Sequence, residues 1–230
     1  MLKINITEQD VRTLFIGLLL FEISIVLVFL FHLLLGSPVE VFNNFFHLDR
    51  EANIPAWFSS MQLFMIGMVF FLTGYRSQSQ PVVLSRTVLA FLAVAFVFLS
   101  VDETASIHEK MHVILKHREW MPSLKIGLWI PIYLFLIVLI TIAIYPHIRI
   151  MWAHFPREAK LLVMGTLIFL LGAVGIEIVA DLFLRHDIRS IAYGVEVAIE
   201  ELLEMAGASV ILYGALLFAI RSSDNLGPRQ

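Results

Sequence analysis

Six long apolar stretches, separated by short polar connections, divide the chain. A helix needs about 20 residues to cross the hydrocarbon core of a bilayer, and each stretch reaches that length. We therefore expect an all-α integral membrane protein: a single domain over residues 1–230, folded as a bundle of six transmembrane helices. An even number of crossings places the N and C termini on the same side. The expected spans are residues 13–35, 56–75, 82–101, 126–145, 161–184 and 190–220.

Local features refine this pattern. We expect the third span to continue as an extramembrane helix to about residue 118. Pro131 lies inside the fourth span and predicts a kink there, because proline has no N–H to donate. Glycines at positions 165, 172 and 175 punctuate the fifth span and predict close packing against a neighbouring helix.

The composition supports contact with lipid. Of the residues, 59% are hydrophobic and 15% are charged, whereas a soluble domain has about half and about a quarter, respectively. The net charge of −3 gives no reason to expect a nucleic-acid partner. The absence of cysteine excludes disulfides, thiolate zinc sites and cysteine-ligated iron–sulfur clusters. Any metal site must therefore use histidine and carboxylate ligands.

Charged residues are distributed unevenly between the two expected sides. Nine of the basic residues fall on the side of the termini and seven on the opposite, far side. The positive-inside rule then favours cytoplasmic termini, and we expect the protein in a bacterial inner membrane. Acidic residues show a stronger bias, because only four lie on the side of the termini, and we relate this bias to function. Those four are Glu8, Asp10, Glu158 and Asp224.

Counting along the helices brings acids from several spans to one depth. At 1.5 Å per residue, Glu177 and Glu204 each lie roughly 24 Å from the boundary on the side of the termini. Asp102, Asp181 and Glu200 come out near 30 Å by the same count. The hydrocarbon core is about 30 Å thick. The sequence therefore predicts a layer of carboxylates at the far interface.

The negative charges of the acids in the fifth and sixth spans have to be balanced. Like charges four residues apart on a helix repel, so they cannot all stay ionised without bound cations, basic partners or protonation. Alternatively, they lie on exposed helix ends and pair locally with Arg185 and Arg189. The acids in question are Glu177, Asp181, Glu196, Glu200, Glu201 and Glu204.

The string His108-Glu109-Lys110-Met111-His112 has the H-E-x-x-H spacing. Histidines at i and i+4 share one helix face and can bind one zinc ion, while the adjacent glutamate activates a water molecule. Glu109 is therefore the candidate catalytic base. We expect a divalent metal ion, zinc first, with iron or manganese also compatible with the oxygen-rich ligands. The candidate metal ligands are Asp102, His108, His112, Glu177, Asp181, Glu200 and Glu204.

Together with Glu177-x-x-x-Asp181, this string resembles the gluzincin metallopeptidases, including membrane enzymes that cleave prenylated or misfolded proteins. The resemblance implies that His108 and His112 bind zinc, that Glu109 is the general base, that Glu177 completes the site and that Asp181 orients a histidine. On one continuous helix, His112 would stand some 20 Å beyond Glu177. A chain reversal near Ser106 would close that gap, but nothing in the sequence demands one.

Two further patterns involve the same segment. L-S-V-D-E-T-A-S-I-H-E is similar to a string in uncharacterised multi-pass bacterial membrane proteins, which implies that Asp102, Glu103, His108 and Glu109 act together. Glu109-x-x-His112 also matches half of the pattern of carboxylate-bridged dinuclear sites in helical bundles. The second half of that pattern lacks its histidine.

Several functions fit these patterns. The first is a metal-dependent hydrolase or oxidoreductase acting on a lipid-like or membrane-embedded substrate. Alternatives are a non-catalytic accessory or structural subunit that meets a membrane-protein partner through the far-side loops, and a gluzincin-like membrane peptidase. A transporter ranks third, with Glu22 and the carboxylate layer as cation-binding positions. Glu22 lies in mid-bilayer at about 14 Å depth, and the alternatives for it are a hydrogen-bonded neutral acid or a place in a proton path. Membrane lipids are expected partners in every case.

Overall fold

The computed structural model describes residues 6–36, 39–50, 52–76, 84–117 and 124–224. Every regular element in these ranges is helical, and six helices there are long and apolar enough to cross a membrane. The predicted all-α bundle with six long apolar helices is confirmed. Its elements are α1 (Glu8–Leu34), α2 (Glu40–Phe46), α3 (Ile54–Arg76), α4 (Arg86–Ala105), α5 (Ile107–Lys116), α6 (Trp129–His154), α7 (Pro156–Leu170), η2 (Leu171–Ile176), α8 (Glu177–Val179), η3 (Ala180–Leu184), η4 (Arg185–Asp187) and α9 (Ile191–Asp224).

Local sequence explains where several helices begin. The Thr7 hydroxyl accepts a hydrogen bond from the Asp10 backbone N–H, and the Asp10 carboxylate accepts one from the Thr7 N–H. This reciprocal capping satisfies two backbone donors at the start of α1. Ser85 caps α4 in the simpler way, by accepting from the N–H of Val88. Pro156 begins α7 at a position where no N–H is needed.

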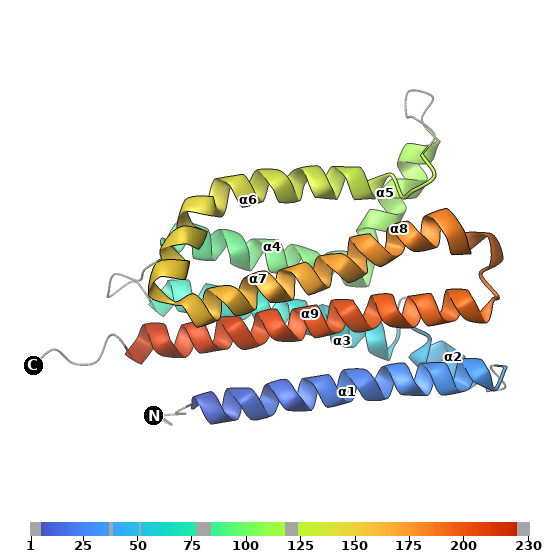
Figure 1. Cartoon of the computed structure of the whole chain (residues 1–230), viewed down its shortest axis with the longest axis horizontal. Helices are drawn as coiled ribbons and strands as arrows, with labels where there is room; N and C mark the ends of the chain where they lie inside the picture. Colours follow the sequence, from blue (N-terminus) through green and yellow to red (C-terminus); the bar gives the residue numbers. More distant parts are fainter. Residues whose placement is uncertain (1–5, 37–38, 51, 77–83, 118–123, 225–230) are drawn as a thin grey trace, which may run out of the picture.

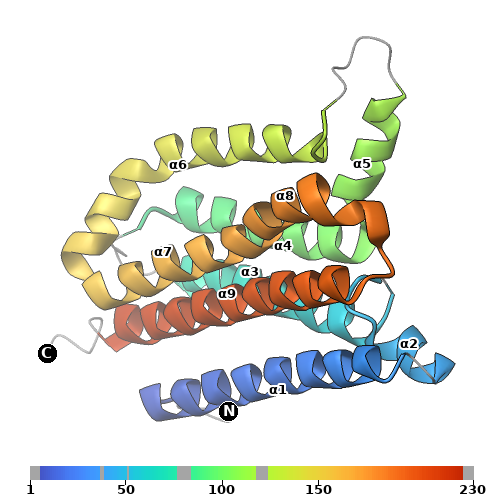
Figure 2. The same ribbon diagram turned by 45° about the vertical axis from the view of Figure 1, so that its right-hand side comes forward.

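Helix α9 is the centre of the bundle. It lies along α1, α3 and α7 (Figure 1), and it is the most buried of the six long helices. Helix α6 is the opposite case, because only 11% of its most apolar window is buried. In both views α6 stands apart from α4 and α7 over most of its length (Figures 1 and 2).

The first and last helices are tied together at one end of the bundle. Glu8 at the start of α1 pairs with Arg221 of α9 and with Arg157 of α7, each at 3.0 Å. The start of α1 and the end of α9 therefore lie at this end, and we call the opposite end, which carries α5, the far end (Figure 1).

Glycines allow α7 and η2 to approach α9 closely. A Cβ atom on Gly165 would lie 2.9 Å from the carbonyl oxygen of Gly207, and one on Gly172 would lie 2.8 Å from that of Glu200. Such distances leave no room for a side chain. The close packing predicted for this helix therefore occurs at Gly165 and Gly172. Gly175 instead faces Leu171 of its own helix.

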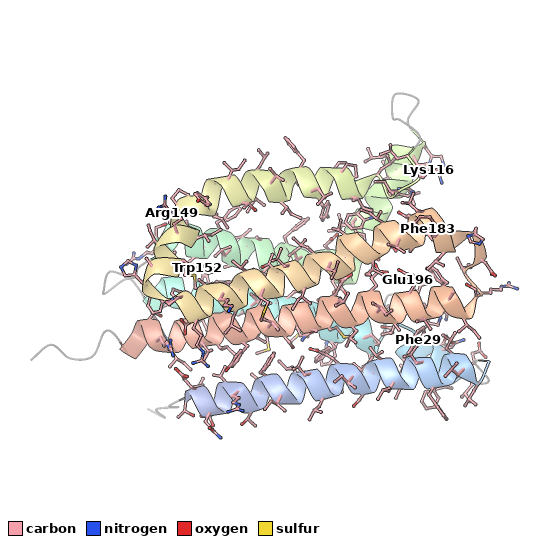
Figure 3. All side chains as sticks on the ribbon, viewed as in Figure 1. Phe29, Lys116, Arg149, Trp152, Phe183 and Glu196 are labelled. Atoms are coloured by element: carbon pink, nitrogen blue, oxygen red, sulfur yellow. The ribbon has the colours of Figure 1, made fainter. Side chains whose placement is uncertain are left out.

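Two local predictions were wrong. The third span does not continue unbroken to residue 118, because Ser106 adopts a left-handed conformation (φ 48°, ψ 46°) between α4 and α5. Pro131 does not kink α6, because it lies in the first turn, where proline is tolerated. Pro146 is the proline inside α6, and the helix continues past it to a bend close to Arg149 (Figure 3).

Candidate functional site

The break at Ser106 turns α5 steeply away from the axis of α4 (Figure 2). The Asp102 carboxylate on α4 accepts a hydrogen bond from the backbone N–H of His108 at 2.9 Å, so it caps the first turn of α5. Its other oxygen lies 3.2 Å from Nδ1 of the His108 ring. Asp102 is buried, with 6% of its surface exposed. One carboxylate thus fixes both the backbone and the ring of His108.

The His108 ring also contacts the start of α6. Its centroid lies 4.9 Å from that of the Trp129 indole, and the Tyr133 hydroxyl interacts with Asp102 from the next turn. With Nδ1 directed at Asp102, the neutral ring presents Nε2 as an acceptor. This is the arrangement in which proteins commonly offer histidine to a metal ion.

The charges around His108 favour its protonated form. Burial alone would lower the pKa of the ring, but the hydrogen bond and the negative charge of Asp102 oppose this effect. The charges of Glu109 and Glu103 act in the same direction as Asp102, and the net result is a pKa above the ordinary value for histidine.

Two successive backbone N–H groups anchor the segment that enters α6. The N–H of Leu128 donates to Nδ1 of His112 at 2.9 Å, and that of Gly127 donates to the Asp181 carboxylate at 2.7 Å. Because Nδ1 of His112 accepts a hydrogen bond, the neutral ring carries its proton on Nε2. His112 therefore holds the chain in place, and its remaining nitrogen is a donor.

The fifth long helix changes its winding where its acids lie. The segments η2 and η3 are π-helical and flank Glu177, which begins α8. Such turns are rare and often occur at functional sites. Arg185 closes the end of this helix by pairing with Glu177 at 2.6 Å and with Asp181 at 3.0 Å. The predicted alternative, in which Arg185 pairs locally with these acids, therefore describes part of the site.

The remaining acids lie on α9. We call Glu177, Glu196, Glu200 and Glu204 the acidic cluster, because Glu177 interacts electrostatically with each of the other three. His108 lies within electrostatic range of Glu177 as well. The cluster therefore joins α8 to α9 at the far end, beside the His108 ring.

Glu196 is attracted by Arg185, but its carboxylate lacks a hydrogen-bond donor within the described chain. It is 6% exposed, and no donor among the described residues reaches either of its carboxylate oxygens. The carboxyl group of Glu200, one turn later, lies against it. Two facing carboxyl groups without a donor leave room for a cation or a shared proton. Figure 3 shows Glu196 between α9 and the helix that carries Glu177.

A family model for a domain of unknown function, DUF8692, matches residues 15–220, which is most of the chain. The chain belongs to the DUF8692 family. No curated protein and no solved structure matches it. Because the DUF8692 family has no assigned function, a function for this chain has to be inferred from the residues of the site.

In the structure of this DUF8692 member, candidate residues come together in two groups. Asp102 and His108 form one, and Glu177, Glu200 and Glu204 belong to the other. His112 and Asp181 lie between α5 and the fifth helix and bind backbone N–H groups. Glu109, the candidate base, is exposed on α5. Within the described ranges no three histidine or carboxylate side chains are arranged closely enough to hold a metal ion as they stand.

Two participating side chains in this DUF8692 member were not named as site residues, Trp129 and Tyr133. Arg185 was expected only as a local partner of the acids, and it follows Asp181 by one helical turn. Trp129 and Tyr133 had no signal in the sequence, since tryptophan and tyrosine at the end of a span are also typical interfacial anchors.

Proposed function

We propose that the protein is an integral membrane protein whose six long helices cross a bacterial inner membrane, with both termini in the cytoplasm. The apolar and largely exposed surface of α6 supports this proposal, because such a surface requires lipid or a partner around it. The acidic cluster then lies at the far interface, at the depth of the lipid headgroups.

The acidic cluster, in this proposal, binds a divalent metal ion beside His108. Glu196 is the observation that carries it, because this buried carboxylate has no donor among the described residues and faces two other acids. The single positive charge of Arg185 is less than the four carboxylates require when ionised. A divalent cation would supply the missing charge, with Nε2 of His108 and cluster carboxylates as ligands. Binding would have to draw these side chains together.

The proposed activity is metal-dependent chemistry on a lipid-like or membrane-embedded substrate. A zinc or manganese ion held by this ligand set would lower the pKa of a bound water and promote hydrolysis, while iron would permit oxidation. A carboxylate of the cluster would accept the proton from that water. The location at the interface favours a substrate with its polar group among the headgroups and its chain in the bilayer.

Elemental mass spectrometry on protein purified in mild detergent without chelator tests this proposal. We expect stoichiometric metal in the wild type and in Glu40→Gln, an exposed acid at the same end. Glu196→Gln and His108→Ala should lose most of the metal while keeping their helical circular dichroism. A metal-free wild type would refute the proposal, and retention of metal by both folded variants would refute the ligand set.

A second function, that of an accessory subunit, is supported by a different observation. Arg185 already pairs with Glu177 and Asp181, so part of the acid layer is stabilised without any ligand. On the exposed surface of α6, Phe135 and Ile142 are 63% and 66% exposed and could meet another membrane protein. Photo-crosslinking from these two positions in native membranes separates the functions: a single protein adduct supports a subunit, and lipid adducts alone oppose it.

A further inference from the structure

A second polar cluster lies in the middle of the bundle, away from the far end. Glu22 of α1, Gln62 of α3 and Ser209 of α9 meet there, and none of them is more than 3% exposed. Gln62 Nε2 donates to Glu22 Oε1 at 2.8 Å and to Ser209 Oγ at 2.8 Å. The Ser209 hydroxyl donates to the same Glu22 oxygen at 2.6 Å. Three helices therefore converge on one oxygen atom.

Two acceptor atoms in this cluster lack a partner within the described chain. Neither Glu22 Oε2 nor Gln62 Oε1 has a hydrogen-bond donor among the described residues. Each is bonded to the same carbon as an atom that takes part in the 2.8 Å contact between the two side chains. A carboxylic acid and a primary amide have complementary edges, because each offers one donor and one acceptor. One hydrogen on Glu22 Oε2 would supply the donor that the pair lacks.

The same conclusion follows if the Gln62 amide is turned round, since its oxygen and nitrogen are assigned from hydrogen bonding. The amide oxygen would then lie 2.8 Å from Glu22 Oε1, and two acceptors at this distance need a hydrogen between them. The turned amide therefore requires a proton between the two oxygens, and in the first orientation a proton on Glu22 Oε2 supplies the donor that Gln62 Oε1 lacks among the described residues.

The surroundings of Glu22 offer no charge, among the described residues, that would favour its ionised form. Its interactions there are with Ser209 and Gln62, which are both neutral. The adjacent core is apolar and includes Ile25 and Met205. Glu158 is an instructive contrast, because it is also 0% exposed but pairs with Arg221 at 2.9 Å. An unpaired buried carboxylate is far more costly than a paired one.

We propose that the Glu22–Gln62–Ser209 cluster is a proton-binding site in the centre of the bundle. Glu22 is the residue that carries the proton, as a neutral carboxylic acid, and Gln62 and Ser209 hold it in place. This site is independent of the metal site proposed at the far end.

Infrared spectroscopy of purified protein near neutral pH tests the proposal. The Glu22→Gln variant should lose one C=O stretching band of a protonated carboxylic acid, a band that shifts on exchange into heavy water. The Glu158→Gln variant, the matched buried control, should lose carboxylate bands instead. Loss of carboxylate bands in Glu22→Gln would overturn the proposal, because it would show an ionised Glu22.

Thermal unfolding provides an independent test. The amide introduced by Glu22→Gln can both accept from Ser209 and donate to Gln62, so the midpoint should change by no more than about 4 °C. Failure of Glu22→Gln to fold would overturn the proposal, because the amide supplies the acceptor and the donor of a neutral acid but not the charge of a carboxylate. A rise in the wild-type midpoint with sodium but not choline chloride, absent in Glu22→Gln, would also overturn it in favour of a cation.

Discussion

Asp102 has two roles that involve the same neighbour. It lies buried in the last turn of α4, where its carboxylate accepts a hydrogen bond from the backbone N–H of His108 and contacts the His108 ring. The direction of α5 and the protonation of His108 therefore depend on one side chain. The string around these two residues implied that they act together, but the continuous helix expected through them does not exist. The contact arises because the chain turns at Ser106.

Replacing Asp102 by asparagine should lower the pKa of His108. Burial alone lowers this pKa, and the variant removes the hydrogen bond and the charge that oppose burial. Histidine-ring NMR against pH, in detergent, measures the effect. Glu40→Gln is the control and should leave the His108 titration unchanged. An unchanged titration in Asp102→Asn would show that the pair does not form.

The raised pKa of His108 also makes stability depend on pH. Because the folded-state pKa lies above the unfolded value of 6.5, the stabilisation is fully present below about pH 6.5 and is lost as pH rises through the folded-state pKa. The wild type should therefore exceed His108→Gln in thermal midpoint most clearly near pH 6, and the difference should shrink in alkaline buffer. A difference that grows with pH would contradict this sign.

Among the elements, the break between α4 and α5 determines the shape of the far end. Serine carries a cost of about 1–2 kcal/mol in a left-handed conformation, whereas glycine does not. Ser106→Gly should therefore unfold at an equal or higher temperature than the wild type. Ser106→Val should be less stable than Ser106→Gly by at least about 1–2 kcal/mol in thermal or denaturant unfolding. Equal stability of the two variants would imply a continuous helix.

The contact between η2 and α9 offers a second test with an internal control. A Cβ on Gly172 would lie 2.8 Å from the Glu200 carbonyl oxygen and 2.9 Å from Glu204 Cγ, whereas one on Gly17 meets nothing within 4 Å. Gly172→Ala should cost about 1–3 kcal/mol and displace the acidic cluster. Gly17→Ala should leave the unfolding midpoint nearly unchanged. Similar midpoints for the two variants would show that the helices are not in close contact.

Hydropathy was sufficient to predict the six long helices, because each must be apolar over its whole length. It could not reveal α2, whose seven residues lie in a connection, nor the π-helical turns around Glu177. Both depend on contacts between helices that one sequence does not display. Counting residues along the helices correctly predicted that Glu177 and Glu204 lie at a similar depth, since both lie on long helices that run in opposite directions. It failed for His112, which lies beyond the turn at Ser106.

At the scale of the whole molecule, the ion pairs of Glu8 with Arg157 and Arg221 hold the start of α1 against α7 and the end of α9. We expect reporter fusions at the N and C termini to give the same response, and fluorescent-protein fusions at both ends to fluoresce as cytoplasmic proteins do. A phosphatase inserted between α4 and α6 should be active in the periplasm. Opposite responses from the two termini would refute the even number of crossings.

The partners of Glu22 have a consequence for biosynthesis. Ser209 follows Glu22 by 187 residues. In the membrane topology proposed above, a growing chain would therefore insert its first helix long before the last one leaves the ribosome. During this interval the buried carboxyl group lacks one of the two side chains that satisfy it, and α1 lacks the surface against which it packs. A chain truncated before α9 would leave a polar group facing lipid. The exposed carboxyl group of Glu22 would then mark an incomplete chain for the membrane proteases that degrade unassembled proteins.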